Sequence, residues 1–107
     1  MPRTNPTLLS SVSAPNTPGQ TRWFPTDGYL HSVSASLKPG GVSATVDIYV
    51  ANAGIGAGVK IATMNLTTAA PSDGFSLPKE DNGWFMVRAE VSAVNGEVQQ
   101  VNACVGE

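Results

Sequence analysis

The chain has 107 residues and a net charge of −2, which is the size of one domain and gives no electrostatic basis for binding nucleic acid or an anionic membrane. Charged residues make up only 13%, against about 25% in an average domain, and Ser, Thr and Gly are abundant instead. The sequence offers neither an apolar run of about 18 residues nor a basic-then-apolar leader, so a transmembrane helix and a secretory signal are not expected. Folding in a reducing cytoplasm is the expectation, and the low surface charge favours a protein that sits in an assembly.

The first 28 residues hold five of the eight prolines, at positions 2, 6, 15, 18 and 25. Proline removes a backbone donor and disfavours both helix and central strand. Only residues 7–14 could form a strand there, at a sheet edge. We therefore predict an extended Pro-rich N-terminal arm over 1–28 and a β domain over 29–107. Trp23 and Phe24 are apolar enough to anchor the arm, either on its own domain or on a partner.

From Tyr29 onward, apolar and polar residues alternate with the period of two that is typical of β-strands. The pattern predicts strands over 29–37, 42–50, 59–68 and 75–77, turns over 38–41 and 71–74, and loops over 51–58 and 78–83. Short strands at this spacing predict an all-β fold: a single small β-sandwich or jelly roll of about six to eight antiparallel strands.

The last 25 residues predict two further strands joined by Asn95-Gly96, a pair that readily supplies positive φ angles. We expect these strands to form a hairpin with a three-residue loop, because that register makes one face almost wholly apolar. In that register Phe85 pairs with Val105, Val87 with Ala103 and Ala89 with Val101. The opposite face is mixed, a poor core and a plausible contact surface, and it carries Trp84, Met86, Arg88, Glu90, Gln100, Asn102 and Cys104.

The residues that could carry chemistry have simpler explanations. His31 is the one histidine and is in phase with apolar neighbours, so it is expected at a core edge or an interface. Cys104 is the one cysteine, expected to be a partly buried, inert thiol, and disulfides within the chain are impossible. The glycine-rich stretch 54–58 lacks the spacing of a nucleotide-binding loop, and the acids of 73–81 match no calcium loop. We predict no enzyme activity, metal or cofactor.

Contact residues are more promising, since Trp and Arg are enriched at interface hot spots. For each residue a simpler alternative to an interface role remains open: Trp84 would close one end of the core, and Arg88 would pair with Glu90 at the surface for little energy. The interface candidates are Trp23, Phe24, Trp84, Met86 and Arg88.

The stretch from Val42 to Glu107, well over half of the chain, resembles small β-sandwich proteins encoded beside the major capsid gene of tailed bacteriophages. The resemblance lies in the order of several segments rather than in any one of them. The loop 51–58 departs from the pattern, because related proteins often carry Ser-Asn-Asp-Gly-x-x-Trp there. The matching segments after the first alternating strand are Met64–Thr68, Ser72–Phe75, Trp84–Ala89 and the final Gly106-Glu107.

The resemblance implies a non-enzymatic virion protein made in the host cytoplasm, a decoration or cement protein on the capsid surface. Its partners would be the major capsid protein and itself, as a homodimer or homotrimer, with neither nucleic acid nor membrane involved. An alternative is a tail or fibre module that binds host-surface glycans through exposed aromatic side chains at a loop edge. An enzyme built around His31 is the remaining, disfavoured reading.

Overall fold

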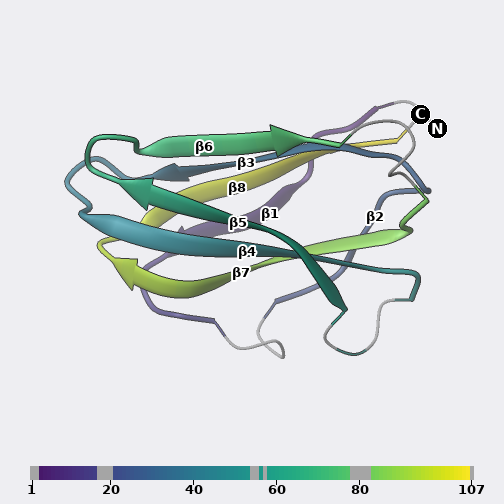
Figure 1. The fold of residues 1–107 in the computed structure, drawn as a ribbon, viewed down its shortest axis with the longest axis horizontal. Coiled ribbons are helices and arrows are strands. Elements are labelled where there is room, and N and C mark those ends of the chain that lie inside the picture. The colour runs from purple at the N-terminus through teal and green to yellow at the C-terminus, as the bar shows by residue number, and fades with distance from the viewer. Residues whose placement is uncertain (1–2, 17–20, 54–55, 57, 78–82, 107) are drawn as a thin grey trace.

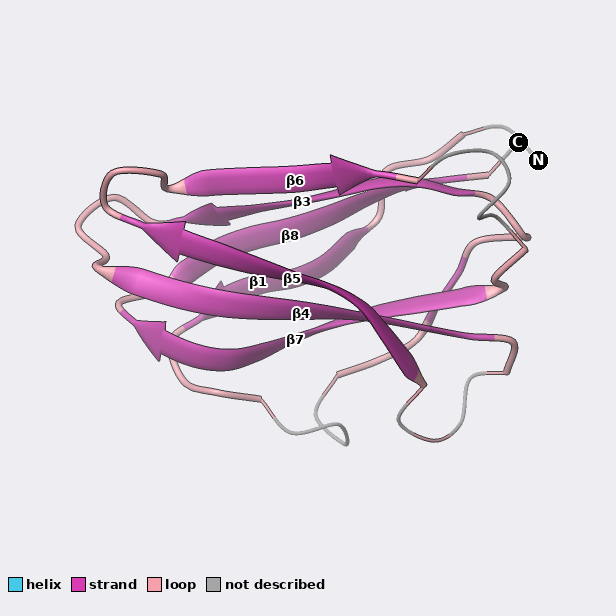
Figure 2. Cartoon of the chain, viewed as in Figure 1, coloured by secondary structure: helices cyan, strands magenta, loops and turns pink. Residues whose placement is uncertain are grey.

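The computed structural model describes residues 3–16, 21–53, 56, 58–77 and 83–106. Over these residues the chain is all-β and without helix, and the strands pair antiparallel (Figures 1 and 2). No helix in the described ranges is long and apolar enough to cross a bilayer. The strands are β1 (Thr7–Val12), β2 (Phe24–Pro25), β3 (Leu30–Leu37), β4 (Ser43–Ala51), β5 (Val59–Thr67), β6 (Ser72–Ser76), β7 (Met86–Asn95) and β8 (Val98–Val105).

The described strands form two four-stranded sheets. Sheet 1 has the order β1-β8-β3-β6, and sheet 2 has the order β2-β7-β4-β5. Figure 1 shows them as two layers, with sheet 2 in front of and below sheet 1 in that view. Apolar residues from both sheets form one core, which confirms the alternation read from the sequence. The fully buried aliphatic side chains in this core include Leu30, Val33, Val46, Ile48, Val50, Leu66, Val87, Val91, Val98, Val101 and Val105.

The predicted hairpin between the last two strands is wrong. β7 pairs with β4 and β2 in sheet 2, while β8 pairs with β1 and β3 in sheet 1. The expected pairs, such as Phe85 with Val105, are therefore absent from the described strands. Both strands do turn their apolar faces to the core, but they face each other across it instead of lying side by side. The alternation of apolar and polar residues shows which face of a strand is buried. It is the same whether β7 and β8 form a hairpin or lie in separate sheets.

The β3–β4 connection and the β7–β8 connection run side by side, and both cross from one sheet to the other. The Val42 N–H donates to the Asn95 carbonyl at 2.9 Å, and the Lys38 N–H donates to the Glu97 carbonyl at 2.8 Å. Gly96 has φ 116°, and a Cβ there would lie 2.6 Å from Cα of Gly41. The expected positive φ at Gly96 is confirmed. It lies in the connection that carries the chain from sheet 2 to sheet 1, and this connection packs against the β3–β4 turn.

A second correction concerns β6. Residues 71–74 were predicted to turn, but Ser72–Ser76 form a strand that pairs with β3. The turn comes earlier, where the Thr67 N–H donates to the Ala70 carbonyl at 3.0 Å and the Ala70 N–H donates to Thr67 Oγ1 at 3.0 Å. Pairing with β3 outweighs the local turn preference of Asp73-Gly74, as tertiary context commonly does.

The first 28 residues contribute to both sheets. β1 is an edge strand on β8, as predicted for residues 7–14, and Leu8 is buried in the core. The chain then reaches sheet 2, where Asn16 N–H donates to the Val91 carbonyl at 2.8 Å and Asn16 Oδ1 accepts from the Val91 N–H at 3.0 Å. β2 continues along the same edge by pairing with β7.

Candidate functional site

Arg88 is the centre of a cluster on the outer face of sheet 2, which we call the Arg88 cluster: Thr21, Trp23, Tyr49, Arg88 and Glu90. Although Arg88 is charged, it is only 1% exposed. Its guanidinium lies over the Tyr49 ring at 4.1 Å and over the Trp23 ring at 5.3 Å. Nη1 donates to Glu90 Oε2 at 2.8 Å and to Thr21 Oγ1 at 3.1 Å. The predicted pair with Glu90 is confirmed, but its expected surface position is wrong.

The strand register explains how the Arg88 cluster is assembled. Tyr49 on β4 is the cross-strand partner of Arg88 on β7, so both side chains project from the same face. Thr21 and Trp23 come from the segment that leads into β2 and cover the guanidinium from outside. The cluster therefore fastens residues 21–23 to sheet 2. Sequence reasoning missed Tyr49, because which side chain lies opposite Arg88 depends on strand pairing.

Next to Arg88, Asp47 and Glu90 are cross-strand partners and bring two carboxylates to the same part of the sheet. Asp47 is 7% exposed and accepts a hydrogen bond from Thr63 Oγ1 at 2.8 Å, while the Glu90 side chain is 13% exposed. Like charges directly opposite each other destabilise a sheet. The ion pair between Arg88 Nη1 and Glu90 Oε2, at 2.8 Å, offsets that repulsion and helps to stabilise the fold.

The other interface candidates lie apart from Arg88's immediate contacts. Phe24 and Trp84 are half-buried and pack against the core, and Arg22 lies over the Phe24 ring at 4.7 Å. Met86 is half-buried at the start of β7 and pairs with Pro25. For Trp84, these contacts correspond to the alternative in which it closes one end of the core.

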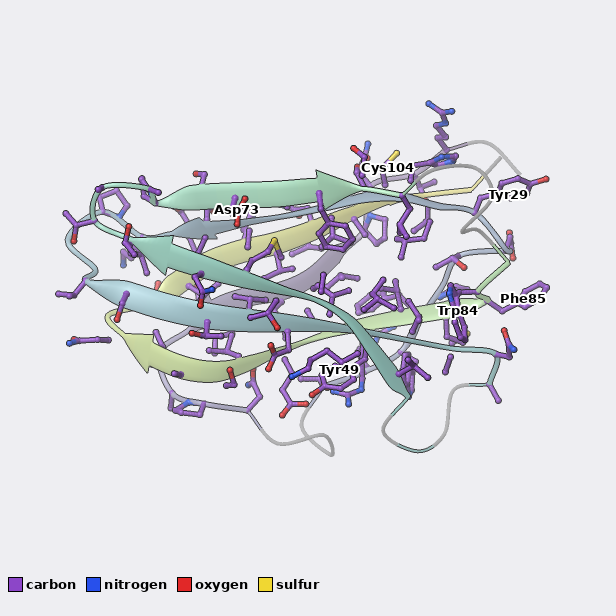
Figure 3. The ribbon with its side chains drawn as sticks, viewed as in Figure 1. Tyr29, Tyr49, Asp73, Trp84, Phe85 and Cys104 are labelled. Atoms are coloured by element: carbon purple, nitrogen blue, oxygen red, sulfur yellow. The ribbon has the colours of Figure 1, made fainter. Side chains whose placement is uncertain are left out.

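Two aromatic side chains that the sequence analysis did not select are the exposed ones. Phe85 is 52% exposed and Tyr29 is 37% exposed. Figure 3 shows both projecting outward at the same end of the molecule, and we call them the end patch. Phe85 was expected on the apolar face of a strand, but β7 begins only at Met86, so the alternation does not extend to it.

The backbone beneath the end patch is tightly held. Thr26 is fully buried; its N–H donates to the Phe85 carbonyl at 2.9 Å, and its Oγ1 donates to the Trp84 carbonyl. The Tyr29 N–H in turn donates to the Thr26 carbonyl at 2.9 Å. One buried threonine thus links the two segments that carry the exposed rings, which presents them on a fixed backbone.

A second surface feature is a shallow hollow of about 390 Å³ on the outer face of sheet 1. Asn102 and Gln100 are held in place at its β8 side, since Thr7 Oγ1 donates to Asn102 Oδ1 at 2.9 Å and Asn102 Nδ2 donates to Gln100 Oε1 at 3.2 Å. The hollow is lined by Ser34, Ala35, Ser36, Ser72, Asp73, Gly74, Gln100 and Asn102. Its chemistry is that of short hydroxyl and amide groups, with one carboxylate at the rim.

The residues considered for catalysis or metal binding do not form a common site among the described residues. His31 is half-buried; its ring stacks on Tyr29 at 6.2 Å, and its Nε2 donates to the Gly106 carbonyl at 2.5 Å. Cys104 is partly buried, as expected. Within the described residues, no group of three or more His, Cys, Asp or Glu side chains could hold a metal ion. Most of the glycine-rich stretch 54–58 and residues 80–82 lie outside the described residues.

Over its described residues the chain is therefore a small, compact, two-sheet all-β protein with two exposed aromatic side chains at one end. Comparison of the chain with protein-family models, with curated proteins and with solved structures gave no match.

Proposed function

We propose that this chain is a non-enzymatic structural protein of a tailed-bacteriophage virion that binds the outside of the capsid and stabilises contacts between major capsid subunits. We also propose that the fold is a β-sandwich or jelly roll in which residues 1–28 form a Pro-rich arm. The resemblance of Val42 to Glu107 to capsid-associated proteins supplies the biological setting. The observation that supports a binding role is the end patch, because Tyr29 and Phe85 expose two aromatic side chains at one end of the molecule, and aromatic residues are enriched at interfaces.

The mechanism follows from the size of the patch. A stable interface buries about 800 Å² on each partner, which two aromatic side chains cannot supply. Capsid attachment would therefore need further contacts around the end patch and more than one copy of the chain. A homodimer or homotrimer that binds neighbouring capsid subunits gains avidity, because the second contact forms at high effective concentration. Phe85 and Tyr29 would be anchors whose backbone is already ordered, which lowers the entropic cost of binding.

The first test is electron-microscopic localisation of this protein on assembled phage particles. Regular density on the head surface supports the proposal and reveals the oligomer. Density at the neck, tail or fibre contradicts the head assignment, and absence from particles contradicts a virion role.

A mutational test isolates the end patch. Phe85→Ser and Tyr29→Ser should each weaken binding to undecorated heads by about tenfold or more, since each removes an apolar contact from the patch. Val42→Ser is the matched control, because Val42 is 54% exposed but lies at the β3–β4 turn, away from the patch. Equal affinity of all three variants would refute the role of the patch.

The second candidate is a tail or fibre module that binds host-surface glycans. The hollow on sheet 1 favours it, since fixed amide and hydroxyl groups can hydrogen-bond to uncharged sugars. A wild-type chain that does not bind heads but gives a glycan-array signal, with that signal lost in Asn102→Ala, would support this candidate over the first.

A further inference from the structure

β6 is the edge of the fold that differs from the others. Edge strands are ordinarily protected against pairing with other chains by bulges, prolines, lysines or shortness. β1 has a register shift between Thr7 and Leu9, and Ser11 has φ 54°. β2 is two residues long and ends in Pro25. β5 carries Lys60 and a register shift opposite Ile48 and Tyr49.

β6, by contrast, pairs in continuous register with β3 over five residues, Ser72 to Ser76, and contains neither proline nor lysine. Four of its five residues are exposed. This is the regular geometry that a further strand can extend.

Alternation along β6 shows which backbone groups face outward. The Leu37 N–H donates to the Pro71 carbonyl at 2.7 Å, and the Leu77 N–H donates to the His31 carbonyl at 2.9 Å. In an antiparallel ladder the hydrogen-bonded positions recur every second residue, so Asp73 and Phe75 also face β3. The backbone groups of Ser72, Gly74 and Ser76 therefore point away from the sheet.

One outward group is already occupied. The Gly74 N–H donates to the carboxylate of the preceding residue, Asp73 Oδ1, at 2.8 Å. Asp73 is thus the local protection of this edge. It is a protection that a carbonyl from an incoming strand can replace, because the carboxylate is exposed and regains water as it leaves.

The geometry points to self-association through β6: two copies pair their β6 strands antiparallel about a two-fold axis at Gly74. In that register Gly74 pairs with Gly74, and Ser72 pairs with Ser76 of the other copy, so every outward backbone group of the strand finds a partner. Asp73 lies opposite Phe75 of the other copy rather than opposite the second Asp73, so the carboxylates avoid a direct like-charge pair. Sheet 1 of one copy and sheet 1 of the other copy then form one continuous sheet.

This inference deepens the homo-oligomer in the proposed function by assigning its surface. It is tested on purified protein without phage particles, so its failure and a failure of head localisation are separate results.

Sedimentation equilibrium over a concentration series measures the dimer constant of the wild type and three variants. Ser76→Pro removes two of the six intermolecular hydrogen bonds while sparing the β3 ladder, and should weaken dimerisation by about tenfold. Ser76→Ala is the control, because it keeps the N–H and should leave the constant unchanged. Asp73→Ala frees the Gly74 N–H and removes a negative charge, and should tighten the dimer several-fold.

Amide hydrogen exchange of the wild type gives a readout that needs no variant. Protection of the Ser72 and Ser76 amides should rise with protein concentration, while the Phe75 amide, which faces β3, stays unchanged. A chain that is monomeric across the series, an equal constant for Ser76→Pro and Ser76→Ala, or concentration-independent exchange at Ser72 and Ser76 would overturn the assignment.

Discussion

Replacing Arg88 with alanine should destabilise the fold by about 3 kcal/mol, close to the lower end of the cost of breaking a buried ion pair. The lower end applies because the Glu90 side chain retains 13% exposure and can be partly hydrated. Alanine removes the bonds to Glu90 and Thr21 and both ring contacts. It also leaves Glu90 opposite Asp47 without the positive charge that pairs with it.

The assay is urea denaturation followed by circular dichroism, with a thermal scan as a second measure. For a domain of this size, 1 kcal/mol corresponds to about 4–8 °C, so the melting temperature should fall by about 12 °C or more. Arg22→Ala is the matched control: Arg22 also lies over an aromatic ring but is exposed, so its loss should cost under about 1 kcal/mol.

The double variant Arg88→Met with Glu90→Gln separates the charge from the packing. Methionine keeps much of the buried volume and glutamine removes the stranded charge, so the double variant should be more stable than Arg88→Ala. The reasoning is refuted if Arg88→Ala costs no more than Arg22→Ala, or if the double variant is the least stable of the three.

Three further predictions concern the rest of the fold. Gly96→Ala should cost about 2 kcal/mol or more in urea denaturation, because a Cβ would collide with the Gly41 backbone; Gly40→Ala, with φ 94° and open space around it, is the control and should cost less. Trp84→Ala should lower the unfolding free energy by about 2 kcal/mol, less than the about 3–5 kcal/mol of a buried Trp because the ring that packs against the core is only half-buried; normal stability with a smaller oligomer by light scattering would instead favour an interface role. Deleting residues 1–28 should prevent stable folding, because it removes β1, β2, the buried Leu8 and the cover of Arg88; a cooperative thermal transition in the truncated chain would contradict this.

The core was predictable from the sequence because buried apolar residues recur at every second position of a strand. Val46, Ile48 and Val50 alternate with polar residues and are fully buried. Sheet membership leaves no such pattern, since a strand shows the same alternation whichever neighbour it pairs with. For that reason the burial of Val87 and Val101 was predicted correctly, while the predicted pairing of β7 with β8 was wrong.

The candidate site was harder to predict for the same reason. Arg88 could be selected as an interface candidate because arginine is enriched at interfaces. Its burial could not be predicted, because it depends on Tyr49, its partner across the β4–β7 pair, and on Trp23 from a distant segment. Phe85 was assigned to the core because alternation was extended one residue beyond the true start of β7. The available signal was Gly83, which has φ 123° and interrupts extended strand geometry two residues before Phe85.

The two proposed contact surfaces have a geometric relation that bears on function. β6 ends at Ser76, and the next residue bonds to His31, beside Tyr29 of the end patch. The end patch therefore lies at the C-terminal end of β6. Antiparallel pairing of two β6 strands places the two C-terminal ends on opposite sides of the axis, so the end patches of a dimer point away from each other. A dimer built in this way would bridge two separate sites rather than clamp one, which is consistent with the proposed joining of neighbouring capsid subunits.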